Sequence, residues 1–154
     1  SQGWFFEDTW TSYSDIGSIY QGEKLTYNEY EQVESLYTKA IILVMESLNI
    51  THLQVKGLEN HGFINEDSLV DQAEVVFVNQ LKENDLLSLE QVKLASKLVL
   101  REYFWCKLIS KDKMFVHFGY DYYMFIGSRL ECQSAIEKIK ELGLFVECFE
   151  SPYL

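Results

Sequence analysis

Hydrophobic residues recur every three or four positions in four parts of the chain, which is the spacing of one helix face. The predicted helices cover residues 27–48, 69–82, 88–104 and 129–142. The first is apolar almost all round in its second half, so we expect it to be central and largely buried. The second contains Val75-Val76-Phe77-Val78, which would also suit a strand, although the polar residues around it favour a helix.

Three of these helices are preceded by residues that typically start a helix. A capping box needs Ser or Thr before the helix and Glu or Gln three positions later. The pairs with this spacing are Thr26 with Glu29, Ser88 with Gln91, and Ser128 with Glu131. Gly143 follows the last helix and is expected to end it.

Alternating or short apolar runs between the helices predict strands at residues 51–58, 114–118, 122–126 and 144–149. The second and third flank Gly119-Tyr120-Asp121 and should form a hairpin. Strand 122–126, the last helix and strand 144–149 have the lengths of a right-handed βαβ crossover. The predicted fold is α+β in a single domain, residues 1–154. About four helices pack on a small mixed sheet of about four strands, with a C-terminal ββαβ unit.

The first 25 residues fit no helix or strand pattern but are rich in large apolar side chains. We expect them to pack over the domain or to form part of a binding face. The residues concerned are Trp4, Phe5, Phe6, Trp10, Tyr13, Ile16, Ile19 and Tyr20.

The charge balance narrows the choice of partner. The chain has 13 basic and 24 acidic side chains, a formal net charge of 13 − 24 = −11. Such a surface repels nucleic-acid phosphates and anionic membranes, and attracts a basic protein or a cation. Acidity that only keeps the protein dissolved is the simpler alternative. The longest clearly apolar run, Ala40–Met45, is far shorter than a membrane-spanning helix.

The sequence contains no recognisable catalytic or metal-binding pattern. Three widely spaced cysteines without a CxxC argue against a disulfide framework and a zinc site. His52, His61 and His117 have no metal-ligand spacing, and phosphate-binding, nucleotide-binding and hydrolase motifs are missing. We therefore expect neither catalysis nor a metal or cofactor. The first residues show no signal-peptide pattern, and the cysteine usage suits the cytoplasm.

Two groups of side chains are candidates for binding a protein partner. The first is Tyr120, Asp121 and Tyr122 at the hairpin turn, because tyrosine gives a large contact area and Asp121 can pair with an Arg or Lys. The alternative is that Asp121 is an ordinary turn residue and that Tyr123 and Phe125 belong to the core.

The second candidate group is Glu29, Glu31 and Glu34 in the first half of helix 27–48, where they should reach solvent. A helix N-terminus favours carboxylates in any case, which is the alternative explanation. The basic ladder Lys93, Lys97 and Arg101 is expected to form internal salt bridges with this acidic surface.

The C-terminal third resembles a known class of proteins. It contains Leu100-Arg101-Glu102-Tyr103-Phe104-Trp105-Cys106, the segment Phe-Gly-Tyr-Asp-Tyr-Tyr-Met and the closing Gly-Leu-Phe-Val-Glu-Cys-Phe-Glu-Ser-Pro-Tyr. In overall texture residues 98–154 are similar to the immunity proteins encoded beside secreted bacterial polymorphic toxins.

This resemblance implies a small, acidic, cytosolic domain that binds the C-terminal domain of a toxin and blocks its active site. Many such toxins are nucleases with basic clefts. It implies no particular site residues. Two other classes remain open: a small-molecule sensor or small enzyme with a pocket between the sheet and the N-terminal aromatic residues, and a structural subunit of a larger complex.

Overall fold

The computed structural model describes residues 2–4, 19–20, 23–24, 27–60, 71–111, 113–119, 124–128, 133–144 and 147–148; of these, residues 2–4, 19–20, 23–24, 27 and 147–148 are described by their backbone alone. This part of the chain forms α-helices and an antiparallel sheet, so the predicted α+β class is confirmed.

Four helices lie in the described part, as expected. They are α1 (Tyr27–Ser47), α2 (Gln72–Gln80), α3 (Leu89–Leu100) and α4 (Gln133–Glu141). The segment that could have been a strand is helical, because Asp71 and Glu74 form a capping box at the start of α2, with Glu74 N donating to Asp71 Oδ1 at 2.9 Å. The box predicted at Ser88 and Gln91 is confirmed at the start of α3.

The third predicted box, Ser128 with Glu131, is not tested, because residues 129–132 lie outside the described residues. Ser128 itself is the last residue of a strand and pairs with Met114. Thr26 and Glu131 lie outside the described residues.

The main sheet has seven strands in the order β5-β4-β6-β7-β8-β1-β9. Five of them are β5 (Leu86–Ser88), β4 (His52–Glu59), β6 (Trp105–Ser110), β7 (Met114–Phe118) and β8 (Met124–Ser128); β1 (Gln2–Trp4) and β9 (Glu147–Cys148) continue the sheet at one side. A separate ribbon joins β2 (Ile19–Tyr20) to β3 (Glu23–Lys24).

The predicted mixed sheet of about four strands is wrong in two respects. Each neighbouring pair in the described sheet is antiparallel, and there are more strands than expected. The ββαβ unit is not confirmed in the predicted form, because β1 lies between β8 and β9 and pairs with both. The short strand β1 depends on partners at least 120 positions away, so no local pattern predicts it.

Strand β6 was not predicted, because the third helix was expected to continue to residue 104. The helix instead ends at Leu100, and Glu102 adopts a left-handed backbone conformation with φ 66°. Glycine is the usual signal for such a conformation, and here none is present. The predicted pairing of β7 with the next strand as a hairpin is confirmed, with Phe118 opposite Met124, but the second strand covers residues 124–128 instead of 122–126.

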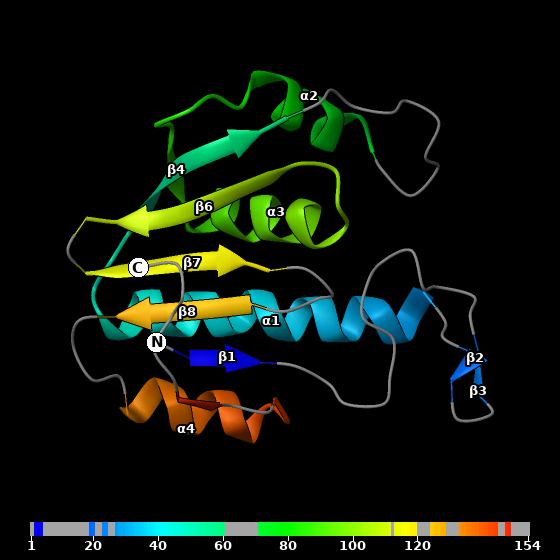
Figure 1. Cartoon of the computed structure of the whole chain (residues 1–154), viewed down its shortest axis with the longest axis vertical. Helices are drawn as coiled ribbons and strands as arrows, with labels where there is room; N and C mark the ends of the chain where they lie inside the picture. The colour runs from blue at the N-terminus through cyan, green and yellow to red at the C-terminus, as the bar shows by residue number, and fades with distance from the viewer. Residues whose placement is uncertain are drawn as a thin grey trace.

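Helices α1 and α3 lie side by side behind the sheet, and α4 lies next to α1 near β1 and β9 (Figure 1). Alternate residues of the strands point into this helical side, among them Leu53, Val55, Leu108 and Val116, each of them 0% exposed. As expected, the second half of α1 is largely buried, with Ile41 and Met45 fully enclosed.

The opposite face of the sheet carries an aromatic cluster around His117. This residue lies across from Lys107 on one side and Phe125 on the other. Its ring meets those of Trp105 and Phe125 edge-on, at centroid distances of 5.2 and 6.3 Å. Burial, together with the positive charge of Lys107, lowers the pKa of His117 from 6.5 to about 4.

This lowered pKa predicts a pH-dependent stability. The unfolded chain takes up a proton at His117 near pH 6.5, but the folded chain does so only near pH 4. The free energy of unfolding should therefore fall as the pH decreases through this window. Urea denaturation of wild type and His117→Phe at several pH values should show a smaller decrease for the variant, and parallel curves would contradict the assignment.

Candidate functional site

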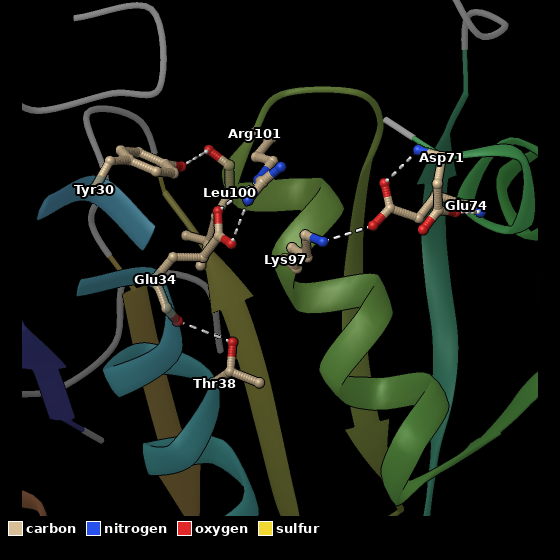
Figure 2. A network of polar contacts seen from close by, with 8 residues as sticks. All are labelled: Tyr30, Glu34, Thr38, Asp71, Glu74, Lys97, Leu100 and Arg101. Carbon is tan, nitrogen blue, oxygen red and sulfur yellow. Dashed lines mark hydrogen bonds and ion pairs between the residues drawn. The ribbon is translucent and has the colours of Figure 1, made fainter. Parts of the chain in front are cut away.

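A polar network joins the first half of α1 to the end of α3 (Figure 2). Arg101 donates two hydrogen bonds to Glu34, from Nε at 2.8 Å and from Nη2 at 3.0 Å. The two residues are 2% and 3% exposed. Beside them the Tyr30 hydroxyl donates to the Leu100 carbonyl at 3.0 Å. The two-bond geometry fixes the position of α3 against α1.

The prediction that Glu34 reaches solvent is wrong. Its position falls on the face of α1 that packs against α3, and the carboxylate is enclosed with Arg101. Burial raises the pKa of Glu34, and the hydrogen bond and positive charge of Arg101 only partly oppose this rise. The Glu34 carboxylate therefore joins α1 to α3, and it is not the solvent-exposed acidic group that was predicted.

The basic ladder of α3 is paired internally, as predicted. Besides Arg101 with Glu34, Lys97 Nζ lies 2.6 Å from Glu74 on α2, and Lys93 Nζ lies 3.1 Å from Glu90. Only Arg101 pairs with the acidic half of α1. The Lys97 pair extends the network to the start of α2, where Glu74 also receives the backbone N–H of Asp71 at 3.4 Å (Figure 2).

An open groove of about 1040 Å³ lies above this network, between α3 and α4. The outer face of α1 forms its floor, and one face of each neighbouring helix forms a wall. Apolar side chains from all three helices line it, namely Ile42 and Leu43 of α1, Leu94 of α3 and Leu142 just after α4. We call this hollow the helical groove.

The charges of the helical groove are balanced, with four glutamates and four lysines among its lining residues. Four of these belong to the pairs already described: Glu34, Glu90, Lys93 and Lys97. The others are exposed and form no ion pair with the described residues: Lys39, Glu46, Lys138 and Glu141. The helical groove thus offers an apolar strip bordered by charged groups of both signs.

The described side chains as a whole are nearly neutral. They include 13 acidic and 11 basic residues, a net charge of −2, against −11 for the chain. Most of the excess acidity therefore belongs to segments of the sequence outside the described side chains. The long-range field of the protein and the local chemistry of the helical groove are two separate properties.

Of the other predicted site residues, Glu31 lies near the helical groove. Glu29 and Glu31 are exposed in the first half of α1. Glu31 lines a smaller hollow of about 560 Å³, which shares Ser35 with the helical groove. Tyr120, Asp121 and Tyr122 lie outside the described residues, and the prediction for them is not tested.

Local sequence patterns do not predict the helical groove itself. Its walls come from α3 and α4, which are separated by more than 30 positions in the chain, and no local motif links them. One signal was present: Lys39 interrupts the apolar second half of the first helix at a position that faces outward. Lys138 gives no separate signal, because a lysine near the C-terminal end of a helix is also favoured by the helix dipole.

The described residues contain no group of three or more His, Cys, Asp or Glu side chains positioned for a metal ion. Burial raises the pKa of the Cys106 thiol to about 12, so this cysteine is a poor nucleophile. Among the helices in the described part, none has the length and hydrophobicity required to span a bilayer.

Comparisons with known proteins identify no relative. No family model, no curated protein sequence and no solved structure matches the chain.

Proposed function

We propose that the protein binds and neutralises another protein without catalysing a reaction, as an immunity protein does for a secreted bacterial toxin. The observation that supports this best is the helical groove. An apolar centre bordered by charged and polar groups is the usual anatomy of a protein-binding surface. The resemblance of residues 98–154 to immunity proteins points in the same direction.

The proposed partner is the basic C-terminal domain of a toxin, with a nuclease as the expected activity, and the proposed location is the cytoplasm. The net charge of −11 favours encounter with a basic protein. Glu29 and Glu31 would act at the border of the interface, next to the end of the helical groove. Tyr120, Asp121 and Tyr122 remain proposed contacts from the hairpin turn.

Co-expression tests this function. If a secreted-toxin gene lies beside the gene of this protein, the C-terminal domain of that toxin is produced in bacteria with and without the chain. We expect growth to be restored, and protection to require roughly equal amounts of the two proteins, because a binding protein is consumed one for one. Continued killing in the presence of abundant folded protein contradicts the proposal. Protection by trace amounts indicates an enzyme instead.

Charge removal at the start of α1 should affect association. With the toxin domain as ligand, the double variant Glu29→Gln/Glu31→Gln should associate roughly two- to tenfold more slowly at low salt, with little change in dissociation. Added salt should mask the difference.

The matched control is Glu59→Gln/Glu137→Gln, which removes two exposed carboxylates elsewhere. Both double variants change the net charge from −11 to −9, so they differ only in where the charge is lost. Surface plasmon resonance at two salt concentrations measures both rates. Equal slowing by the two variants would show that Glu29 and Glu31 have no local role.

A further inference from the structure

We infer that the helical groove receives a single amphipathic α-helix of the partner, with an apolar stripe flanked by side chains of both charges. This inference rests on the proposed function, because it assumes that the site binds protein. It goes further in naming the secondary structure and the charge pattern of the bound segment.

The hydrogen bonding of the lining elements favours a bound helix over an extended segment. The floor and walls are made of α-helices, whose backbone groups bond within each helix. An extended peptide needs N–H and C=O partners of the kind that a sheet edge supplies, and here it would leave its own polar groups buried without them. A helix satisfies its backbone internally and needs only side-chain contacts.

The dimensions also suit a helix. The lining residues of α1 run from Glu34 to Glu46, which corresponds to about 18 Å along the helix axis, so the floor has room for a bound helix of roughly twelve residues. Over that length a helix presents three or four apolar side chains on one face. Ile42, Leu43, Leu94 and Leu142 form the apolar strip opposite them.

The charged border specifies the flanks of the bound helix. Lys39 and Lys138 are exposed without an ion pair among the described residues, and so are Glu46 and Glu141. Two cations and two anions favour a helix that carries both acidic and basic residues beside its stripe. A second copy of this chain is disfavoured, since both copies would carry a charge of −11.

A peptide selection tests the inference without the toxin. The purified full chain is used to select binders from a displayed library of random peptides about 14 residues long. We expect the selected peptides to share apolar residues at positions i, i+3 or i+4, and i+7. We also expect them to gain helical circular dichroism on binding.

Variants of the protein then show where the selected peptides bind. Leu94→Asp should weaken the selected peptides at least tenfold, whereas Leu86→Asp should not, although Leu86 is 65% exposed on the sheet-edge strand β5. Lys39→Glu/Lys138→Glu changes only exposed side chains and should weaken peptides with acidic flanks, which keeps the test valid if Leu94→Asp misfolds.

Several results would overturn the inference: no peptide with a helical stripe, peptides that bind as extended chains, or equal binding to the groove variants. Any of these results combined with growth protection by the wild type would leave the proposed function standing. Helical peptides that bind in the groove of a chain giving no protection would reject the function and keep the site.

Discussion

Replacing Arg101 by methionine should lower the free energy of unfolding by about 3–5 kcal/mol at neutral pH, since it leaves the buried carboxylate of Glu34 without its cation. Methionine preserves much of the side-chain volume, so the cost reports the lost charge and hydrogen bonds. Urea denaturation followed by circular dichroism measures it.

The loss should shrink as the pH falls. Burial already raises the pKa of Glu34 in the wild type, and removal of Arg101 raises it further. A group whose pKa is raised on folding favours the folded state at low pH and loses that contribution as the pH rises through the folded value. Wild type and variant should therefore approach one another in stability as the pH falls and Glu34 becomes protonated in both.

Two controls separate this pair from surface ion pairs. Glu34→Gln/Arg101→Met removes both charges and should recover a large part of the loss. Lys93→Met removes the cation of an exposed pair, in which the side chains of Lys93 and Glu90 are 47% and 83% exposed, so the expected loss is about 1 kcal/mol or less. Equal losses for Arg101→Met and Lys93→Met, independent of pH, would show that the Glu34–Arg101 pair does not hold α1 to α3.

Replacing Leu108 by alanine should cost about 2–5 kcal/mol, because the side chain is 0% exposed in the centre of the sheet and its removal leaves a cavity. Its neighbour Ile109 points to the other face and is only partly buried. Ile109→Ala should cost less, and Lys107→Ala less than Leu108→Ala as well. Thermal or urea denaturation of the three variants compares them.

This alternation tests strand β6, which the sequence did not predict. In a strand, residues 107, 108 and 109 point in alternating directions, so the large loss should be confined to residue 108. Comparable losses at residues 108 and 109 would contradict the strand and its register with Val116.

Local patterns predicted the helices well, because amphipathic spacing and capping boxes depend on neighbouring residues. The box at Ser88 and Gln91 is an example. Local patterns failed where pairing between residues far apart in the sequence decides the structure. Strand β1 forms only because Gln2 pairs with Ile126 and Cys148. Helix α3 ends at Leu100, shortly before the left-handed Glu102, and no glycine marks this end in the sequence.

The candidate site was only partly predictable for the same reason. The basic ladder was expected to pair with the acidic half of α1, and this is confirmed for Arg101 alone, since Lys97 pairs with Glu74 and Lys93 with Glu90. The burial of Glu34 did not follow, because it depends on how α3 is placed against α1. The helical groove required the relative positions of three helices, which spacing along the chain does not contain.

The most direct test of the account is methyl NMR of the chain, labelled at Ile and Leu, during titration with the toxin domain encoded by the adjacent gene. We expect a 1:1 complex in which the methyl signals of Ile42, Leu43, Leu94 and Leu142 shift most, because these residues line the helical groove. The signals of Leu86, on the far edge of the sheet, should stay unchanged. Formation of a complex with unchanged groove signals, or no complex at all with a toxin domain that the chain protects against, would contradict it.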